Sequence, residues 1–490
     1  MKSNVLSTAA VGAGLLAAGV AAQTACASVL VPSYSPPSVA PGWSAQLVVN
    51  GLKKPRSIQF DAGGGLLVVE SGKGITRFTF KDNGGTCLAV DQAITVVADT
   101  TLNHGLALAN DGKTLYASNV EAVFAWAYDP ARGALLGDRR AVVANMSNND
   151  LTTRTLLMSQ AVPGQLVVSR GSAENYDVDA LNKSSGLSQI RAFDLARLLD
   201  THPPYNFNAD GRVLGWGLRN SVGVGEHPKT GAIYSVENSI DGVKREGSDI
   251  DRSNPGEELN YHGFLNGTTA GQGGNYGYPN CFAVWDTNLP GTSTVAGGLH
   301  VGDQFSLVQN ATLNDTTCAQ QYVAPRLTLP AHFAPLDILF GDDGAQAYVS
   351  FHGSFDKTNP QGYRVSTIDF DPQRGTPLEP PSSTRALSRD IISNPGQAAQ
   401  CPANCFRPVG LAWGPRGRLF VTSDTTGEIY VLSRDASSSS SSSSGTTATT
   451  SGSIVTATGK ANGAAAALGR PALGVLGGVA ACVVGGLMVL

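Results

Sequence analysis

The sequence predicts an all-β protein, a six-bladed β-propeller with long loops on the pocket face. Three observations support this fold class. A hairpin pattern with a glycine-containing turn occurs six times, helical periodicity is scarce throughout, and the spacing of the hairpins widens in one Gly-, Asn- and Pro-rich stretch. Hairpins repeated around a ring form a propeller, which leaves only short, protected strand edges.

Each predicted hairpin has an apolar strand, a short polar turn with glycine and a second apolar strand. In chain order they span residues 57–71 (SIQFDAGGGLLVVES), 105–119 (GLALANDGKTLYASN), 156–172 (LLMSQAVPGQLVVSRGS), 223–239 (GVGEHPKTGAIYSVENS), 337–354 (DILFGDDGAQAYVSFHGS) and 410–424 (GLAWGPRGRLFVTSD). The early copies are about 50 residues apart. We interpret residues 240–335 as long loops rather than a separate domain, because this stretch has too little apolar periodicity to form a core.

The two ends of the chain differ in composition from the predicted propeller, which spans residues 23–434. Residues 1–22 have the pattern of a secretory signal peptide, with Lys2, an apolar run and small residues before the cut. Residues 435–461 are rich in Ser, Thr and Gly and predict a flexible stalk. Residues 462–490 combine small residues, a spacer and an apolar tail, which is typical of a GPI-attachment signal; an ordinary membrane helix is the alternative. We therefore expect a secreted, cell-surface protein anchored through GPI.

Cysteines and glycosylation sequons agree with export. Cys482 lies in the tail, and the other six of the seven cysteines suggest disulfides in an oxidising compartment. Sequence order favours Cys26–Cys87, Cys281–Cys318 and Cys401–Cys405, among fifteen possible pairings. Asn-X-Ser/Thr sequons occur at Asn145, Asn182, Asn266, Asn310 and Asn314.

Polar residues at equivalent hairpin edges predict a lined cavity at one end of the propeller. Because blades place their inner strands around a central channel, residues at the ends of these strands converge in space. These residues are Arg56, His104, Arg154, Arg219, Glu237, His352 and Arg407. The net charge of −4 gives no indication of nucleic-acid binding.

Several segments in order carry a family resemblance: LNHGLAL, TRTLL with VSRGSAEN, GLRNSVGVGEHPKTG, ENSIDG, NPGEELNYHG, NYGYPNC, FHGSFDKTNPQGYRV and FRPVGLAWG. With them the chain resembles the fungal pyrroloquinoline-quinone (PQQ)-dependent pyranose dehydrogenases, relatives of soluble quinoprotein glucose dehydrogenase and of L-sorbosone dehydrogenase. The resemblance covers residues 26–434 and implies a six-bladed propeller that binds PQQ and calcium and oxidises a sugar. An external electron acceptor is implied as well, since no haem-binding Cys-X-X-Cys-His run is present.

The resemblance also implies roles for individual residues. Arg219 and Asn220 match the family's GxRN and are expected against the quinone, where the planar, permanently charged guanidinium suits its oxygens. The cofactor-binding residues expected in all are Arg56, Arg154, Arg219, Asn220, His352, Lys357 and Arg407. By position, the carbonyls of Ser239 and Ile240 would hold calcium as a Lewis acid, with Glu237 and Glu258 bracing the turn.

One position departs from the family pattern. The family's catalytic base is a histidine two residues before TRT, and here that position is Leu151, which cannot accept a proton. Three interpretations stay open. His104, or a water held by Asp150, serves as the base; or the chain is a weakened relative that binds cofactor or sugar; or it is a calcium-dependent propeller of the lactonase type. The mostly cationic set of converging residues favours a trianionic cofactor over the metal site of such a hydrolase.

Overall fold

The computed structural model describes residues 26, 29–197, 202–355, 359–394 and 398–435. The expected signal peptide and GPI tail lie outside these residues, as do Lys357 and all of the expected stalk except Asp435. Within the described residues, no helix combines the length and the apolar character needed to cross a bilayer.

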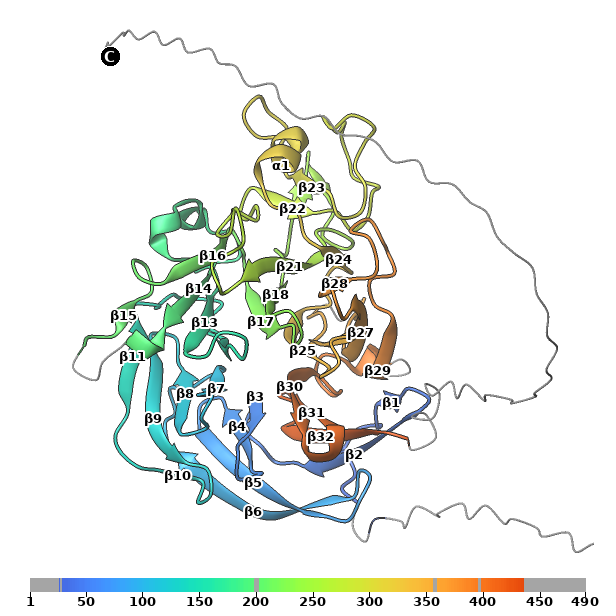
Figure 1. Ribbon diagram of the computed structural model, residues 1–490. Coiled ribbons are helices and arrows are strands. Elements are labelled where there is room, and N and C mark those ends of the chain that lie inside the picture. The colour runs from blue at the N-terminus through green and yellow to red at the C-terminus, as the bar shows by residue number, and fades with distance from the viewer. Residues whose placement is uncertain (1–25, 27–28, 198–201, 356–358, 395–397, 436–490) are drawn as a thin grey trace, which may run out of the picture. The chain divides into compact units, whose positions relative to one another are not determined.

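Six sheets follow one another around a ring, as Figure 1 shows, and the predicted six-bladed propeller is confirmed. Strands within each blade pair antiparallel, except β15, which adds to β11 in parallel. Blade 1 contains β3 (Pro55–Phe60), β4 (Leu66–Glu70), β5 (Gly74–Asp82) and β6 (Leu88–Val97). Blade 2 contains β7 (Leu106–Leu108), β8 (Thr114–Ser118), β9 (Val123–Asp129), β10 (Ala134–Leu135), β11 (Arg140–Ala144) and β15 (Tyr205–Asn206). Blade 3 contains β12 (Leu156–Met158), β13 (Gln165–Arg170), β14 (Gln189–Asp194) and β16 (Arg212–Trp216).

The remaining three blades complete the ring. Blade 4 contains β17 (Ser221–Glu226), β18 (Ala232–Glu237), β21 (Glu257–Phe264) and β24 (Leu327–Leu329). Blade 5 contains β25 (Pro335–Phe340), β26 (Gln346–Phe351), β27 (Arg364–Asp371), β28 (Thr376–Pro377), β29 (Arg389–Ser393) and β1 (Ser38–Val39). Blade 6 contains β30 (Pro408–Gly414), β31 (Arg418–Ser423), β32 (Glu428–Arg434) and β2 (Trp43–Val49). Because β2 precedes blade 1 in the chain yet pairs with β32, it closes the ring.

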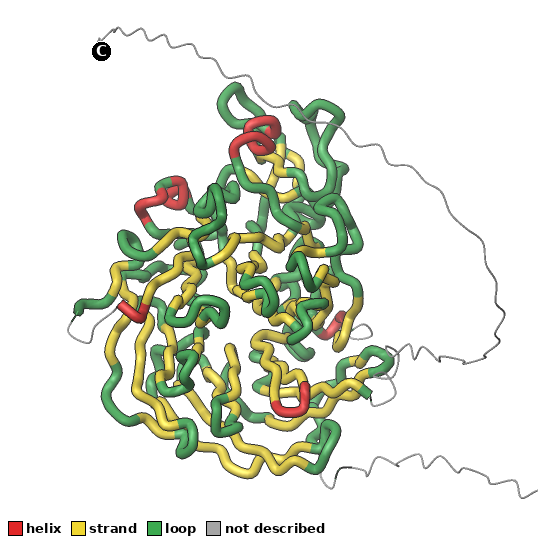
Figure 2. Tube along the Cα trace, viewed as in Figure 1, coloured by secondary structure: helices red, strands yellow, loops and turns green. Residues whose placement is uncertain are grey.

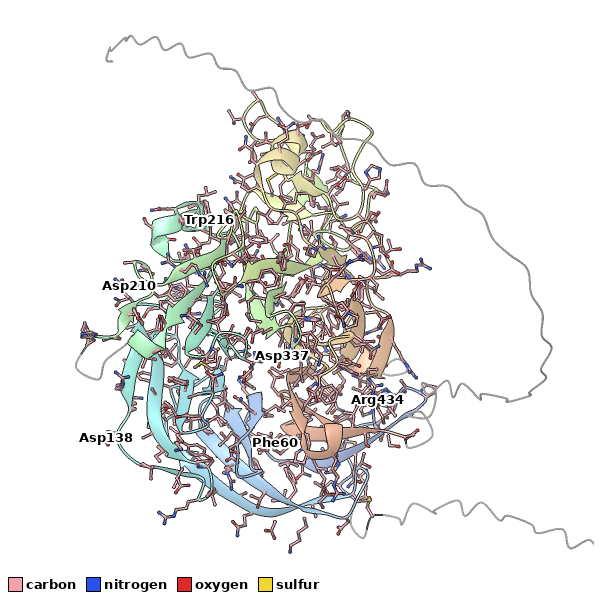
Figure 3. The ribbon with its side chains drawn as sticks, in the orientation of Figure 1. Phe60, Asp138, Asp210, Trp216, Asp337 and Arg434 are labelled. Carbon is pink, nitrogen blue, oxygen red and sulfur yellow. A yellow bond between two sulfur atoms is a disulfide. The ribbon has the colours of Figure 1, made fainter. Side chains whose placement is uncertain are left out.

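All six predicted hairpins form the two inner strands of a blade. The innermost strands contact one another in turn around the ring, from β3 through β7, β12, β17, β25 and β30 back to β3. Apolar side chains fill the space between neighbouring blades, as with Leu67, Leu115 and Trp126 between blades 1 and 2. Figure 3 shows Asp337 of β25 near the centre of the ring and Asp138 at its outer edge.

The expectation of long loops over residues 240–335 is wrong in part. This stretch supplies β21 and β24, the two outer strands of blade 4. Loops prevail in the rest of this stretch, as Figure 2 shows. The stretch also forms two small hairpins and a short helix: β19 (Lys244–Arg245) with β20 (Ser248–Asp249), β22 (Cys281–Ala283) with β23 (Gln304–Ser306), and α1 (Asp315–Gln321). Ile240, Val243, Phe282 and Phe305 pack into a small apolar cluster of their own.

The three predicted disulfides are confirmed. Cys26–Cys87, Cys281–Cys318 and Cys401–Cys405 are all bonded. The second joins β22 to α1 and so fixes the small unit outside blade 4.

Candidate active site

A cavity of about 1080 Å³ opens among the loops at one end of the inner strands. Blade 4 and blade 5 contribute most of its wall, together with β3 and the loop before β12. Its lining residues are Arg56, Leu151, Arg219, Asn220, Asn238, Ser239, Asp241, Asp249, Asp251, Arg252, Glu257, His332, Ala334, Leu336, His352, Gly353, Ser354, Phe355, Asn359 and Gln361. The expected mostly cationic lining is therefore wrong in part, because four carboxylates share the wall with the arginines and histidines.

One wall carries a connected network of cations built around Asp424. Arg56 Nη1 lies 2.6 Å from Asp424 Oδ2, and His352 Nε2 donates to Asp424 Oδ1 at 2.7 Å. Arg407 Nη2 donates to His352 Nδ1 at 2.9 Å, which fixes the neutral ring with its proton on Nε2. Burial opposes ionisation of Asp424, yet His352 and Arg56 hold its pKa well below the usual range. One carboxylate thus neutralises only part of the positive charge on this wall.

Two of the predicted residues lie behind this wall or beside it. His104 is buried, and its Nδ1 accepts from Arg56 Nε at 3.2 Å. Burial, followed by the charge of Arg56, holds the pKa of His104 well below its ordinary value, so the ring is neutral. Arg154 is fully buried and donates to the carbonyls of Leu151, Thr153 and Met146, which holds the loop before β12.

Arg219 lies at the opposite side of the cavity, on the turn between blades 3 and 4. Its guanidinium donates to Ser239 O at 2.6 Å and to Asn175 Oδ1 at 2.9 Å. It also lies 3.8 Å from Asp241 Oδ2. The Arg219 backbone N–H donates to Glu237 Oε1 at 2.6 Å, so the turn before β17 contacts the last residue of β18. Arg219 is held in place by blade 4 and lines the cavity.

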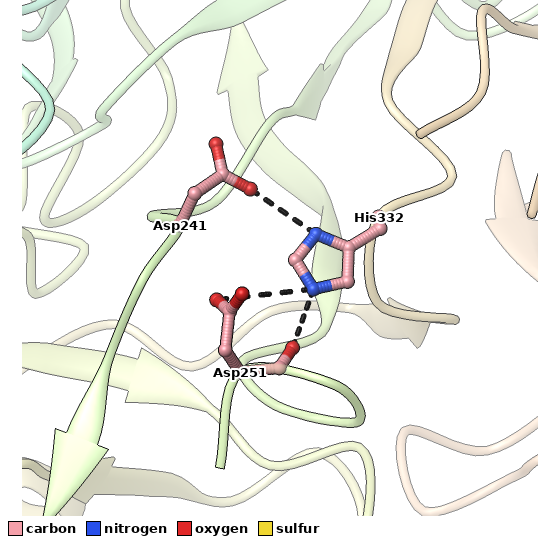
Figure 4. Close-up of side chains that lie close together, drawn as sticks. All are labelled: Asp241, Asp251 and His332. Carbon is pink, nitrogen blue, oxygen red and sulfur yellow. Dashed lines mark hydrogen bonds and ion pairs between the residues drawn. The ribbon is translucent and has the colours of Figure 1, made fainter. Parts of the chain in front are cut away.

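Asp241, Asp251 and His332 form a polar group (Figure 4), and Asp241 lies 3.8 Å from the Arg219 guanidinium. One ligand atom of each residue lies within 4.8 Å of the others, so the group could hold a metal ion. His332 Nδ1 lies 3.1 Å from Asp241 Oδ1, and Nε2 hydrogen-bonds to the carbonyl of Asp251. The hydrogen bond to Asp241, against the opposing effect of burial, raises the pKa of His332 to about 9. The imidazole is therefore cationic at neutral pH.

Three buried glutamates support this side of the cavity from blade 4. Glu257 accepts from Ser239 N at 2.7 Å and from Ala334 N at 2.9 Å, and so holds two lining loops together. Burial raises the pKa of both Glu257 and Glu258 to about 7. Burial, and after it the charge of Glu258, raises the pKa of Glu237 well above its ordinary value. Glu237 and Glu258 face each other across the β18–β21 pair. Two neighbouring carboxyls retain one proton between them more readily than both become ionised.

Leu151 occupies the cavity wall at the place where the family's base is expected. Its backbone has a φ of 43°, in the left-handed region that bulky residues rarely adopt. Asp150 is exposed and accepts from the Leu151 backbone N–H at 2.8 Å. Neither His104 nor Asp150 is among the residues that line the cavity.

Comparison with known proteins identifies the family. The TrAA12-like family model matches residues 37–435. The chain is 50% identical to the Hypocrea jecorina protein named pyrroloquinoline quinone-dependent sugar dehydrogenase, over 85% of this chain and 93% of that one. The calcium structure of the Trichoderma reesei family AA12 enzyme superposes with a TM-score of 0.80, covering 84% of this chain and 100% of that chain. This chain belongs to the TrAA12-like family.

A second relative is longer than this chain. The chain is 36% identical to the Coprinopsis cinerea pyrroloquinoline quinone-dependent pyranose dehydrogenase, over 84% of this chain but 56% of that protein. The holo form of that enzyme's PQQ domain superposes with a TM-score of 0.76, at 36% identity, over 84% of this chain and 99% of that domain. The resemblance found in the sequence is thereby confirmed.

Within the TrAA12-like fold, the predicted site residues are only partly brought together. Arg56, Arg219, Asn220, Ser239 and His352 line the cavity. Arg407 lies directly behind His352 and stacks on Phe355, with 4.7 Å from the guanidinium carbon to the ring centre. His104, Arg154 and Ile240 are not among the lining residues, and Lys357 is outside the described part of the chain.

Sequence reasoning missed the acidic side of the TrAA12-like cavity. Asp241 is part of ENSIDG, a segment used for the family resemblance, but its side chain received no role. Asp251 and His332 come from loops of the stretch 240–335, 81 residues apart in the chain. No repeat position marks them, so only a three-dimensional structure could place them together.

Proposed function

We propose that the chain is a PQQ-dependent pyranose dehydrogenase that oxidises the anomeric carbon of a sugar and passes electrons to an external acceptor. The observation that carries the proposal is the Asp424-centred cation network, which faces a large cavity in a chain 50% identical to a protein named a PQQ-dependent sugar dehydrogenase.

The residues of the cavity fit the proposed cofactor. PQQ is a planar molecule with three carboxylates. Its ortho-quinone accepts two electrons and two protons when it is reduced to the quinol. Arg56 on one wall and Arg219 on the other would bind its acidic groups and quinone oxygens through charge-assisted hydrogen bonds, with His352 as a neutral part of the first wall. Arg407 orients His352 and completes the positive wall from behind.

Calcium is a second proposed ligand. Calcium takes oxygen ligands, and Asp241 and Asp251 offer carboxylates near Arg219. The Ser239 carbonyl already accepts from Arg219, and Ile240 belongs to the apolar cluster outside blade 4. We therefore favour the two aspartates over the Ser239 and Ile240 carbonyls as the protein ligands of the ion.

A weakened relative is the second candidate function, and Leu151 is the observation that favours it. Proton transfer by a positioned base contributes about 10²–10⁴-fold to a rate, and the leucine side chain offers no acceptor. The chain would then hold cofactor and sugar while oxidising slowly. Family membership argues against the lactonase interpretation.

Export and anchoring are further parts of the proposal. Residues 1–22, 435–461 and 462–490 have the sequence patterns of a signal peptide, a glycosylated stalk and a GPI signal. Release of the protein from cells by a phosphatidylinositol-specific phospholipase C would support the anchor. Recovery of Leu490 in the mature protein would contradict it.

The test of the enzyme proposal is reconstitution. Protein freed of ligands by a chelator is titrated with PQQ at saturating calcium, and bound cofactor is followed by its absorbance. Addition of aldoses, including L-fucose and 2-keto-D-glucose, should bleach the oxidised chromophore. Absence of binding would overturn the redox assignment, whereas binding without bleaching would favour the weakened relative.

A further inference from the structure

A second hollow of about 350 Å³ lies beside the cavity. Arg252, Asn359 and Gln361 line both, so the two are adjacent spaces with a shared wall. The residues that belong to the second hollow alone include Trp285 and Asp286. A third hollow of about 360 Å³ shares Ser253 and Asp286 with the second, so open space extends away from the cavity beyond the size of one ligand.

Trp285 is a pre-organised aromatic surface. The buried side chain of Asn254 accepts from the backbone N–H groups of Trp285 at 2.8 Å and Asp286 at 3.2 Å. The same amide donates to Asp286 O at 2.8 Å. Three hydrogen bonds to one side chain therefore fix the backbone that carries the indole.

The indole itself is half-buried and available to a ligand. Among the described residues, none stacks on its ring and none hydrogen-bonds to its Nε1. Tryptophan N–H groups usually find a partner when they are buried, and tryptophan is enriched at interfaces where one end of the ring is apolar and the other is wet. Trp285, whose indole has an apolar face and one hydrogen-bond donor, is among the residues that line the hollow.

The polar groups of the hollow complement hydroxyl groups. Asp286 contributes acceptors, Arg252 donors, and Asn359 and Gln361 amides that do both. A sugar ring has the matching chemistry, with an apolar C–H face for an aromatic surface and hydroxyls around its edge. A purely anionic ligand would suit Arg252 but not Asp286.

We propose that the second hollow binds the sugar unit that adjoins the oxidised one, so that the enzyme acts on the reducing end of disaccharides or longer oligosaccharides. The inference rests on the proposed dehydrogenase function and specifies its substrate class. The reducing unit occupies the cavity, and the glycosidic bond passes the shared wall of Arg252, Asn359 and Gln361. The next unit stacks on Trp285.

The experiment compares D-glucose with maltose, cellobiose and lactose, which all have glucose at the reducing end. With PQQ and calcium saturating, we expect kcat/KM for at least one disaccharide to exceed that for glucose fivefold. Trp285→Ala should lower this ratio at least fivefold, whereas Trp285→Phe, which keeps an aromatic face, should retain most of it. Thermal unfolding of both variants shows that the change does not come from lost structure.

A second readout does not depend on turnover. In saturation-transfer NMR with the protein and the same disaccharides, protons of the non-reducing ring should receive saturation, and Trp285→Ala should remove that transfer. A wild-type protein that favours glucose, or a ratio that Trp285→Ala leaves unchanged, would overturn the inference. If no sugar is oxidised at all, the enzyme proposal fails and the NMR measurement alone decides on the second hollow.

Discussion

His352 shows why the charge balance of the cavity depends on one buried carboxylate. Both ring nitrogens are committed, Nδ1 to Arg407 and Nε2 to Asp424, so His352 is held as a hydrogen-bonded spacer rather than as a free base. Asp424 also pairs with Arg56, and both side chains of that pair are about one-eighth exposed. Removing the carboxylate would leave two guanidinium groups near each other without a counter-charge.

We predict that Asp424→Asn destabilises the protein by about 3 kcal/mol, since breaking a buried ion pair leaves an uncompensated charge. Added PQQ should restore more stability to this variant than to wild type, because its carboxylates would replace the lost charge. Thermal unfolding with and without PQQ measures both effects. Asp390→Asn, which breaks the more exposed pair with Arg364, is the control and should cost less than about 1 kcal/mol.

A second residue-scale prediction concerns Leu151. Leu151→His places a proton acceptor in the cavity wall, and histidine adopts the left-handed backbone found there more readily than leucine. We expect kcat on the best pyranose to rise at least tenfold with PQQ and calcium saturating. Leu336→His puts the same side chain elsewhere in this cavity and should give no gain.

The Leu151 prediction has an informative opposite outcome. If wild type is already fast and Leu151→His is slower, the proton is accepted by a group outside position 151. The lining carboxylates would then be tested before His104, which does not line the cavity.

At the scale of the element, three of the repeated hairpins begin with a glycine, and at Gly105 and Gly410 this glycine lies against a backbone carbonyl of the neighbouring blade. A Cβ on Gly410 would lie 2.3 Å from Arg56 O, and a Cβ on Gly105 would lie 2.1 Å from Arg154 O. A hydroxyl from the second strand reaches the same carbonyl in each case: Thr422 Oγ1 to Arg56 O at 3.0 Å and Ser118 Oγ to Arg154 O at 2.7 Å. Gly105 and Gly410 therefore allow a close backbone contact between neighbouring blades.

We predict that Gly410→Ala destabilises the protein by about 2 kcal/mol or more, because the new methyl group overlaps a neighbouring backbone that cannot rotate away. The variant should also weaken PQQ binding, since the displaced carbonyl belongs to Arg56. Chemical denaturation and PQQ titration measure the two effects. Gly137→Ala has open space around its Cβ and should change neither.

The hairpins were predictable because each has a local signal, with apolar strands on both sides of a glycine-containing turn. The outer strands were not, since β21 and β24 lie among Gly-, Asn- and Pro-rich loops and pair with residues far along the chain. The same distinction applies to the site. Arg56, Arg219 and His352 follow the repeat and were predicted, whereas Asp251 and His332 lie in loops that no repeat marks.

At the scale of the whole molecule, ring closure couples the two ends of the propeller. The pairing of β2 with β32 joins residues 380 or more positions apart, for instance Ala45 with Leu432. Such non-local pairing carries a large entropic cost in folding, and β1 adds a second N-terminal strand, to blade 5. The N-terminal strands thus contribute to two blades at once.

The stability of this ring should depend on pH through the buried glutamates of blade 4. Glu258 faces Glu237 across the β18–β21 pair, and Asn260 donates to both carboxyls, at 2.9 Å and 3.2 Å. Burial raises the pKa of Glu258 from 4.5 to about 7, so the folded state keeps a proton that the unfolded chain releases. The free energy of unfolding therefore falls as pH rises from about 4.5 to about 7.

We predict that Glu258→Gln removes most of this loss. The amide stays neutral at every pH, and its carbonyl can still accept from Asn260. Between pH 5 and pH 8, wild type should lose about 3 kcal/mol more of its unfolding free energy than the variant does. Urea denaturation at both pH values, with a chelator present, measures the difference, and Glu121→Gln on the surface should behave as wild type. Equal pH dependence in wild type and Glu258→Gln would show that another group keeps the proton. Glu237→Gln would then be the next variant, because Glu237 is the residue paired with Glu258 across the sheet.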